Sequence, residues 1–353
     1  MPADPDLPPL ETLAALLATS VPGLADLRAE EIQAMREKGV AHAHFRLGGR
    51  GLVLRAPRLS QWALPPAENL AYQAACFRRA APSGATPQLH AVLPVATLLP
   101  RGALVVEEIV GRPPRLPEDL PRLAESLARL HALPLPNPAS RPPLADHGVA
   151  GPIAGTLAVI ERQVDALDAP GVPTATRRAL LDELAWARRL AAEAPAAAQP
   201  IALVGTDTHP GNFLVRQNGS AVLVDLEKAL YGSPAIDLAH ASLPTSTRWD
   251  LDVQANLSAE EIIGFYRHYL ALLPPDAATM LRPWLLPCRR LTWLRTMLWF
   301  ARWRVAAASS QDWSESRVDA TLLAHIRRHI AASLAPGAVA EMRAEWLGGV
   351  LDL

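Results

Sequence analysis

Three oxygen-bearing side chains lie within residues 203–239, which read LVGTDTHPGNFLVRQNGSAVLVDLEKALYGSPAIDLA. Asp207 lies in a polar loop, Asn212 ends that loop, and Asp225 follows an apolar run. Carboxylate and amide oxygens are ligands that hard cations such as Mg²⁺ prefer. We therefore expect Asn212 and Asp225 to hold a magnesium ion, which leaves Asp207 free to act as a base.

A β-hairpin would bring the two expected metal ligands together. Asn218-Gly219 separates FLVRQ from SAVLVD. Asn-Gly between apolar runs is a strong signal for a two-residue turn, because both turn positions then adopt a positive φ. Such a turn places Asn212 directly opposite Asp225 on one side of the ribbon, with Cβ atoms roughly 4.5–5.5 Å apart. The geometric argument for the metal site depends on this register.

The composition restricts the class of protein. The chain has 353 residues, of which 50% are hydrophobic, and a formal net charge of −1 at pH 7. This length allows one large domain or two, with a sizeable core. The lack of a basic surplus argues against nucleic acid as a partner.

The cysteines and the N-terminus indicate a reduced compartment. Cys76 and Cys288 are far apart and belong to no CxxC pair, which argues against a zinc site or a disulfide framework. The N-terminal MPADPDLPPL lacks a basic region followed by an apolar one, and no uncharged apolar run reaches the ~18 residues of a membrane span. We expect a cytoplasmic protein without membrane association.

The first part of the chain has the pattern of a small sheet. Two helices are predicted at its start, over ETLAALLATS and LRAEEIQAMREK, and a third over 66–80. Alternating or apolar runs bounded by Gly and Pro predict strands. These runs cover residues 42–47, 52–55, 89–98 and 102–110.

Helices dominate the second part. EDLPRLAESLARLHAL has apolar residues at the spacing of one buried helical stripe. Further helices are predicted near 153–168 and 174–194, and over most of 236–349. A sheet-rich part followed by a helix-rich part indicates an α+β fold with two lobes, 1–108 and 109–353.

Three linked blocks resemble the aminoglycoside phosphotransferase family, a branch of the protein-kinase-like fold that also holds choline and homoserine kinases. That family typically shows His-Gly-Asp-x-His-Pro-x-Asn, then Ile-Asp-x-Glu, then Gly-Asp-Pro-x-x-Asp-Leu-Ala. In this chain the blocks read GTDTHPGN over 205–212, VDLE over 224–227 and GSPAIDLA over 232–239. The resemblance covers about residues 39 to 240.

The resemblance implies a two-lobed kinase-like fold, with a small N-terminal antiparallel sheet lobe and a larger helical C-terminal lobe. It implies transfer of the γ-phosphate of ATP to a hydroxyl of a small-molecule acceptor. Asp207 would be the base, and Asn212 and Asp225 would hold Mg²⁺. Asp237 is similar to an aspartate that hydrogen-bonds to the backbone of the catalytic loop.

The resemblance also implies nucleotide contacts in the first part of the chain. Arg55 takes the place of the third-strand lysine at the phosphates, and Glu68 that of the helix glutamate that steadies it. Glu107 and Ile109 lie in the segment that resembles the hinge at the adenine. Gly205 replaces the histidine that precedes the base and braces its loop. Arginine keeps the charge of a lysine but changes the geometry.

Several roles stay open on the sequence alone. Glu227 either assists the metal or the acceptor or is an ordinary solvated glutamate, and His209 either contacts a ligand or packs the loop. The stretch 293–304, WLRTMLWFARWR, either walls the acceptor site or is a core helix. Asp312 and Glu315 either attract a cationic acceptor or are loop charges.

Alternative functions also stay open. The acceptor is an aminoglycoside or a metabolite of the choline, homoserine or sugar type, and the residues do not decide between ATP and GTP or set the oligomeric state. A near-neutral chain gives no sign of the strongly acidic pocket that a polycationic aminoglycoside favours. A nucleotide-binding pseudokinase scaffold is a further alternative, motivated by Gly205 and Arg55.

Overall fold

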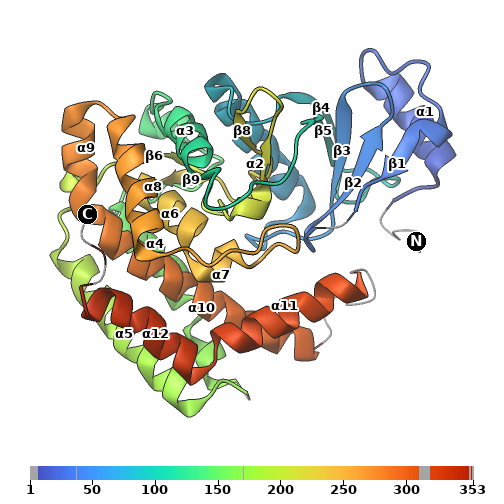
Figure 1. Cartoon of the computed structure of the whole chain (residues 1–353). Coiled ribbons are helices and arrows are strands. Elements are labelled where there is room, and N and C mark those ends of the chain that lie inside the picture. The colour runs from blue at the N-terminus through green and yellow to red at the C-terminus, as the bar shows by residue number, and fades with distance from the viewer. Residues whose placement is uncertain (1–6, 37, 170, 310–318, 350, 352–353) are drawn as a thin grey trace.

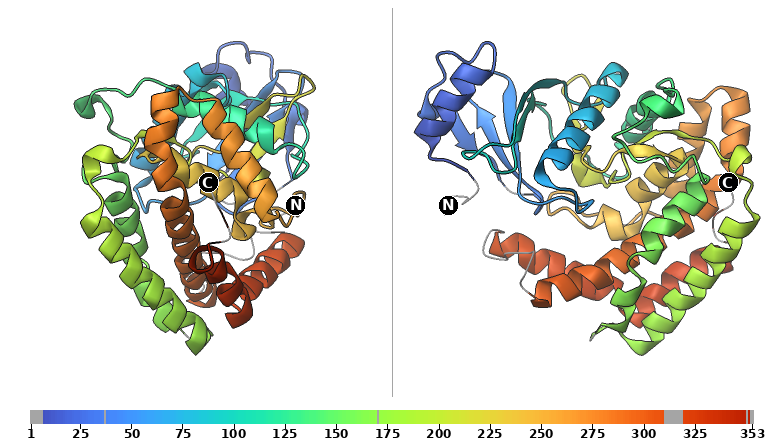
Figure 2. Two further views of the ribbon diagram at one scale, coloured as in Figure 1. Left: turned by 60° about the vertical axis from the view of Figure 1, so that its left-hand side comes forward. Right: turned by 180° about the vertical axis from the view of Figure 1, so that it is seen from behind.

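The structure is a computed structural model that describes residues 7–36, 38–169, 171–309, 319–349 and 351. A small lobe that contains a β-sheet lies beside a larger helical lobe (Figure 1). Figure 2 shows the same two lobes from two further directions. The α+β fold with an N-terminal sheet lobe is confirmed, whereas the division at residues 108 and 109 stays a prediction.

Five antiparallel strands form the sheet of the small lobe, in the order β1-β2-β3-β5-β4. The predicted hairpin is confirmed, because β2 and β3 pair from His42 with Pro57 to Leu47 with Leu52. The strands are β1 (Ile32–Ala34), β2 (His42–Leu47), β3 (Leu52–Pro57), β4 (Leu89–Leu93) and β5 (Ala103–Glu107).

A helix covers each face of this sheet. α1 (Leu10–Ser20) packs with Leu54 and Val105 on the outer face, and α2 (Pro66–Ala80) packs with Val53 and Leu104 on the face toward the helical lobe. Successive strand residues point to opposite faces, so one strand serves both helices. α2 lies between the sheet and the helical lobe in Figures 1 and 2.

The helix predicted over LRAEEIQAMREK is wrong. This stretch contains a short 3-10 turn (Ala29–Glu31) followed by β1, in which Ile32 is buried and pairs with Leu47. The residue types favour a helix locally, but the free edge of β2 offers backbone hydrogen bonds and a buried place for Ile32. Tertiary pairing therefore outweighs the local preference.

The large lobe is built from helices around two apolar cores. The predicted stripe on α3 is confirmed, since Leu123 and Leu127 are completely buried. The helices are α3 (Leu120–His131), α4 (Pro152–Glu161), α5 (Thr174–Glu193), α6 (Pro234–Ser242), α7 (Pro244–Thr247), α8 (Ala259–Ala271), α9 (Pro275–Leu281), α10 (Leu285–Ser309), α11 (Ala320–Ser333) and α12 (Pro336–Leu347).

The aromatic stretch 293–304 belongs to α10 and packs in the core. Trp293, Met297 and Phe300 are buried in one apolar cluster, so the interpretation as a core helix holds for them. Asp312 and Glu315 lie outside the described residues. No helix in the described part of the chain is both long and apolar enough to span a membrane.

Two short ribbons lie between the sheet and the helices. β6 (Ala202–Val204) pairs with β9 (Leu230–Gly232), and β7 (Phe213–Val215) pairs with β8 (Ala221–Leu223). The segment after β5 is tied to the second ribbon, because Arg112 and Val215 exchange two backbone hydrogen bonds. These ribbons carry the loops that hold the candidate site.

Candidate active site

The hairpin of β7 and β8 forms, but its predicted two-residue turn is wrong. Arg216 and Ser220 close the turn, with the amide of Arg216 2.9 Å from the carbonyl oxygen of Ser220. Gly219 has a φ of 85°, whereas Asn218 is not among the residues with positive φ. A three-residue loop of this kind needs a left-handed conformation at its last position alone, and glycine supplies it.

The longer turn shifts the register by one residue. Val224 donates its amide hydrogen to the carbonyl of Asn212 at 2.8 Å, so Asn212 lies opposite Val224 rather than Asp225. A shift of one residue turns a strand side chain to the other face. The predicted face-to-face pairing of Asn212 with Asp225 is therefore wrong, and the metal site loses that support.

Asn212 and Asp225 lie beyond the paired ends of the ribbon, where strand alternation no longer sets their direction. The side-chain amide of Asn212 donates to the carbonyl oxygen of Asp207 at 2.8 Å. Burial and then Arg55 act most strongly on the pKa of Asp225, and the carboxylate of Asp207 is also close enough to act on it. The loop geometry thus replaces the strand register as the feature that gathers these residues.

Asp237 braces the loop that carries Asp207, as the resemblance implies. Its carboxylate accepts hydrogen bonds from the amides of Gly205 at 2.7 Å and Thr206 at 2.8 Å. Thr206 has a φ of 58°, a left-handed conformation that is unusual for a threonine. The two charge-assisted hydrogen bonds offset the cost of this conformation and fix the direction of Asp207.

The brace continues into two helices of the large lobe. Nε2 of His131 lies 3.0 Å from the carboxylate of Asp237, and Nδ1 of His131 lies 2.7 Å from the hydroxyl of Tyr269. Because an ionised carboxylate can only accept, Nε2 of a neutral imidazole carries the proton and Nδ1 accepts from Tyr269. α3 and α8 therefore support the catalytic loop through Asp237.

Gly205 has no room for the histidine that the family places there. A Cβ atom on Gly205 would lie 2.9 Å from Cγ2 of Thr208 and 3.0 Å from Cδ2 of Leu223. The glycine lets the loop pack closely against β8. Bracing by Asp237 and His131 does not use a side chain at position 205.

Asp207 forms a partly buried ion pair with Lys228. Nζ of Lys228 lies 2.6 Å from Oδ2 of Asp207, and Nε2 of His240 lies 3.9 Å from Oδ1. Burial alone would raise the pKa of Asp207, but Lys228, with His209 and His240, holds it far below its ordinary value. Sequence reasoning missed Lys228, because its partner Asp207 lies 21 residues earlier in the chain.

Asp225 pairs with Arg55 from the sheet. Nη2 of Arg55 lies 2.8 Å from Oδ1 of Asp225, and Nη1 donates to the carbonyl of Val224 at 3.1 Å. The guanidinium also lies over the ring of Phe77, 5.3 Å from its centroid. Burial raises the pKa of Asp225, but Arg55 outweighs it and the pKa is lowered to about 2.

The other expected nucleotide residues are more scattered. Glu68 is exposed on α2, and the contacts of Arg55 in the described chain do not include it. Glu107 accepts a hydrogen bond from Arg216 at 2.8 Å, and Ile109 is buried. The nucleotide roles of Arg55, Glu68, Glu107 and Ile109 stay predictions.

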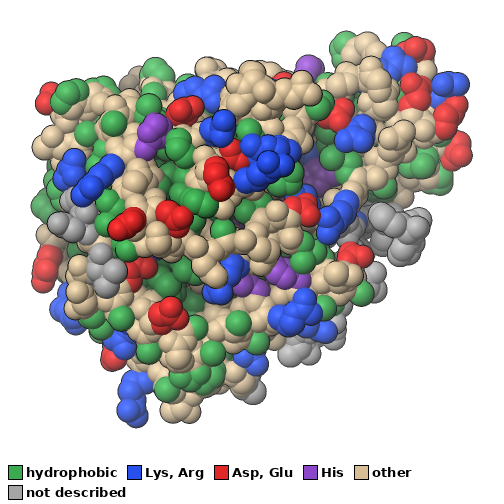
Figure 3. All heavy atoms as spheres, in the orientation of Figure 1, with side chains coloured by type: hydrophobic (Ala, Val, Ile, Leu, Met, Phe, Trp, Pro, Cys, Tyr) green, Lys and Arg blue, Asp and Glu red, His purple; other side chains and the backbone are tan. Residues whose placement is uncertain are grey.

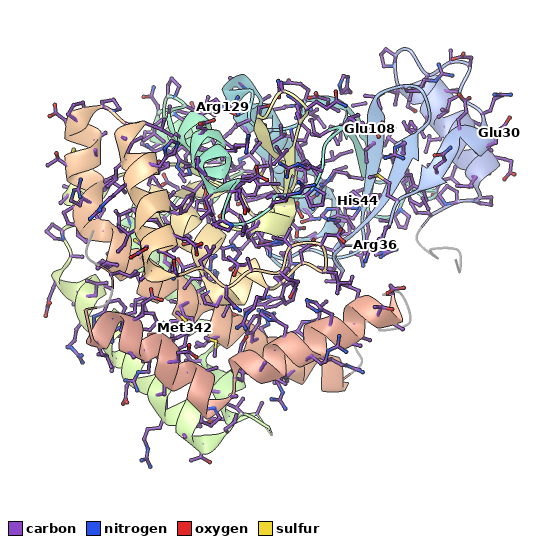
Figure 4. The ribbon with its side chains drawn as sticks, viewed as in Figure 1. Glu30, Arg36, His44, Glu108, Arg129 and Met342 are labelled. Atoms are coloured by element: carbon purple, nitrogen blue, oxygen red, sulfur yellow. The ribbon has the colours of Figure 1, made fainter. Side chains whose placement is uncertain are left out.

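Glu227 is buried, so the interpretation as a solvated glutamate is wrong. Burial, followed by the charge of Asp225, raises the pKa of Glu227 to about 8. Its Oε2 lies 3.6 Å from Nδ1 of His42, whose Nε2 lies 2.9 Å from Oε1 of Gln73 on α2. His44, on the same strand as His42, is cross-strand neighbour to Arg55 and lies at the lower edge of the sheet lobe in Figure 4.

The donor atoms at this site fit Mg²⁺. Asn212 uses its amide nitrogen to bond Asp207, which leaves its side-chain oxygen available, and Arg55 engages one of the two Asp225 oxygens. Across the described residues, no group of three or more His, Cys, Asp and Glu is arranged to hold a metal. Mg²⁺ typically takes one or two protein carboxylates and completes its shell with water and phosphate oxygens, so a sparse protein contribution fits it.

The comparisons with known proteins agree with this geometry. A model of the APH phosphotransferase enzyme family matches residues 36–275, which is more than half of the chain. None of the curated proteins compared with the chain matches it.

Several solved structures have a similar fold. A choline/ethanolamine kinase family protein from Mesorhizobium loti is 20% identical, with a TM-score of 0.59 over 93% of this chain and 96% of that one. A choline kinase from Cryptosporidium parvum is 11% identical, with a TM-score of 0.60 over 97% of both chains. The AMP-bound spectinomycin phosphotransferase is 12% identical, with a TM-score of 0.56 over 94% and 96%.

At these identities the solved structures establish the kinase-like fold, and the family model establishes the kind of enzyme. The two-lobed architecture agrees with the solved structures, and residues 205–239 lie within the range that the family model matches. The chain therefore belongs to the APH phosphotransferase enzyme family and is a small-molecule phosphotransferase.

Proposed function

We propose that this enzyme transfers the γ-phosphate of ATP to a hydroxyl of a small molecule, with Asp207 at the hydroxyl and Asn212 and Asp225 at Mg²⁺. A new bond forms between the hydroxyl oxygen and the γ-phosphorus, the bond to the β,γ-bridging oxygen breaks, and ADP leaves. The hydroxyl proton passes to Asp207 and then to solvent. The observation that carries the proposal is the hydrogen bond from Asn212 to the backbone of Asp207, in a loop that Asp237 holds.

Asp207 is suited to direct a hydroxyl. One carboxylate oxygen is taken by Lys228 at 2.6 Å, while the other has His240 at 3.9 Å and can accept a further hydrogen bond. Because Lys228 holds the pKa of Asp207 low, the carboxylate is ionised and a weak base. A loose transition state for phosphoryl transfer demands little proton removal at the start, so aiming the hydroxyl is the main task.

The sheet lobe supplies a cation on the nucleotide side. The guanidinium of Arg55 is buried, already reaches Asp225, and stays charged at every pH of interest. Mg²⁺, if held by Asn212 and Asp225, would offset the charge of the phosphate oxygens. Adenine nucleotide as donor is supported by the AMP complex of the similar spectinomycin phosphotransferase, although ATP and GTP have yet to be compared on this chain.

A nucleotide-binding pseudokinase is the competing proposal. Its motives were the glycine at position 205 and the arginine at position 55. Both are weakened, because the loop is braced without a side chain on Gly205 and because Arg55 is buried against Asp225. Retention of Asp207, Asn212 and Asp225 together also favours an active enzyme.

ADP release with Mg²⁺, ATP and a panel of hydroxyl compounds tests the proposal. We expect turnover with at least one acceptor, and we expect Asp207→Asn to lower kcat by about 10²–10⁴-fold. Asp276→Asn, at an exposed aspartate on α9, is the matched control and should leave kcat unchanged. Thermal melting would show whether Asp207→Asn is folded. ATP turnover that persists undiminished in a folded Asp207→Asn variant would refute the role of Asp207 and favour the scaffold.

A further inference from the structure

Arg295 lies beside the catalytic loop with most of its guanidinium uncommitted. It projects from α10, is partly buried, and donates from Nη2 to the carbonyl oxygen of Thr206 at 2.7 Å. Within the described chain no carboxylate forms an ion pair with it. Thr206 directly precedes Asp207, so a cation without its own counterion stands next to the proposed base.

The carboxylates near Arg295 are already engaged. Burial lowers the pKa of Arg295, and the two carboxylates that act against this are Asp207 and Asp237. Asp207 is paired with Lys228, and Asp237 accepts two backbone amides and a hydrogen bond from His131. Neither carboxylate makes a direct ion pair with Arg295, so most N–H groups of its guanidinium can still donate to a further oxyanion.

A second cation and two histidines extend this surface. Burial, then Arg295 and Arg162, lower the pKa of His147 to about 4. Asp146 is the single carboxylate that acts on His147, and it is bound to Arg141 at 2.7 Å. Arg162 is exposed at the end of α4 and has no ion pair in the described chain. The side chains near Arg295 thus include cationic N–H groups that no carboxylate engages in a direct ion pair among the described residues.

These histidines also have unused hydrogen-bonding capacity. Nδ1 of His147 and Nδ1 of His240 are buried and have no hydrogen-bond partner among the described residues. α10, which carries Arg295, packs against α6, which carries His240, and against α4, which follows His147. Burial and then, among the nearby charges, Arg295 lower the pKa of both imidazoles. We call Arg295, Arg162, His147 and His240 the cationic wall.

The residues of the cationic wall all come from the helical lobe. They come from α10, the end of α4, α6 and the loop before α4, and α10 packs against both α4 and α6. All of these elements belong to the helical lobe in Figure 1. The expected nucleotide residue Arg55 instead comes from β3 of the sheet lobe. The expected nucleotide cation and the cationic wall therefore come from different lobes.

We propose that the acceptor carries an anionic group, a carboxylate or a phosphate, which binds to Arg295 while the hydroxyl reaches Asp207. The inference rests on the proposed kinase function. Arginine binds such oxyanions with two parallel hydrogen bonds, and the neutral imidazoles can add further ones. A cationic acceptor would place like charge beside Arg295 and Lys228 in a partly buried site, where repulsion is stronger than in water.

Acceptors matched in shape but not in charge test this inference. Glycerate is compared with glycerol, glucose 6-phosphate with glucose, and choline and kanamycin represent the cationic class. With Mg²⁺ and ATP held constant, we expect the anionic member of at least one pair to have a kcat/KM more than about 10-fold above its neutral partner, which is about 1.4 kcal/mol of selective binding. The two pairs distinguish a carboxylate from a phosphate.

Substitutions in the wall give a second measurement. Arg295→Gln should raise KM for the preferred anionic acceptor by about 10-fold or more and leave KM for ATP unchanged, with partial recovery in Arg295→Lys. Arg162→Gln, at an exposed position, should act in the same direction but less. Arg302→Gln is the matched control, since Arg302 is exposed on the same helix outside the wall.

Arg295 also supports Thr206, and a purely structural role would lower kcat for charged and neutral acceptors alike. The inference is overturned if Arg295→Gln affects both classes equally, or if neutral or cationic acceptors are preferred, and the kinase function then stands. Absence of Asp207-dependent turnover with every acceptor overturns the kinase function itself, and the inference with it.

Discussion

The two carboxylates of the site, Asp207 and Asp225, take their cations from different parts of the molecule. Asp225 is bound by Arg55 of β3, across the junction between the lobes, whereas Asp207 is bound by Lys228 of the same lobe. Movement of one lobe relative to the other would break the first ion pair and leave the second intact. The ion pair of the proposed base therefore does not depend on the arrangement of the lobes, whereas the ion pair of the expected metal ligand does.

The charge balance of the two sides differs as well. On the sheet side, Arg55 is matched by Asp225, and a metal-bound nucleotide must share that carboxylate with the arginine. On the helical side, Arg295 and Arg162 make no direct ion pair in the described chain, and the proposed base is paired with Lys228. The whole chain has a net charge of −1, and acidic and basic side chains mix over the face in Figure 3. Within the site, however, the arginines without an ion pair among the described residues lie on the helical side.

The largest effect is expected from Asp225→Ala, which removes the carboxylate that pairs with Arg55 across the two lobes. A ligand at 100 times its Kd stabilises a protein by about 2.7 kcal/mol, and we expect the Mg²⁺-dependent part of the ATP stabilisation to disappear. Thermal shift with ATP, in Mg²⁺ and in EDTA, measures it. Asp276→Ala on α9 is the control. An undiminished Mg²⁺-dependent shift in Asp225→Ala would contradict the metal role of Asp225, and with it the functional difference between Asp225 and Asp207.

Sequence patterns predicted correctly the elements in which the spacing of apolar residues within the element determines its buried face. α2 was predicted over 66–80 and is found at Pro66–Ala80, where Pro66 occupies the first helical position and apolar residues follow a helical period. The brace by Asp237 was implied by the resemblance of residues 232–239 to the family block, and its two hydrogen bonds are present. Local information and tertiary structure agree at these places.

Sequence patterns failed where contacts with residues elsewhere in the chain determine the local structure. Asn-Gly fits both a two-residue and a three-residue turn, and the choice moved Asn212 out of register with Asp225. Ile32 joined a strand because the edge of β2 was available. Lys228 and Arg295 gained their roles from neighbours 21 and 89 residues away, which no local pattern reveals.

A moderate loss of stability is expected from substitutions of Gly205, in the loop that carries Asp207. A Cβ at Gly205 would meet side chains at 2.9 and 3.0 Å, so Gly205→Ala should cost about 1–3 kcal/mol of the free energy of unfolding, and Gly205→His more. Urea unfolding measures both. Gly264→Ala, in α8 with no atom within 4 Å of the new Cβ, should be neutral or stabilising. If Gly205→His were as stable as the native chain, the close packing of the catalytic loop would not hold.

The smallest effect is a pH dependence on the cationic wall. Burial, then Arg295 and Arg162, lower the pKa of His147 from 6.5 to about 4 in the folded chain. As the pH falls from 6.5 toward 4, His147 binds a proton in the unfolded chain but stays neutral in the folded chain. The free energy of unfolding therefore decreases, by at most about 1.4 kcal/mol per pH unit.

His147→Gln removes this contribution, and its stability should fall less steeply than that of the native chain between pH 6.5 and 4, with parallel curves above 6.5. His42→Gln provides the comparison on the sheet side, because burial and then Arg55 lower the pKa of His42 to about 4 as well. An anionic acceptor bound at Arg295 would offset the charge that faces His147 and leave His42 unchanged. Urea unfolding with and without glycerate measures both differences, and an equal response of the two histidines would show that the anion does not bind at the wall.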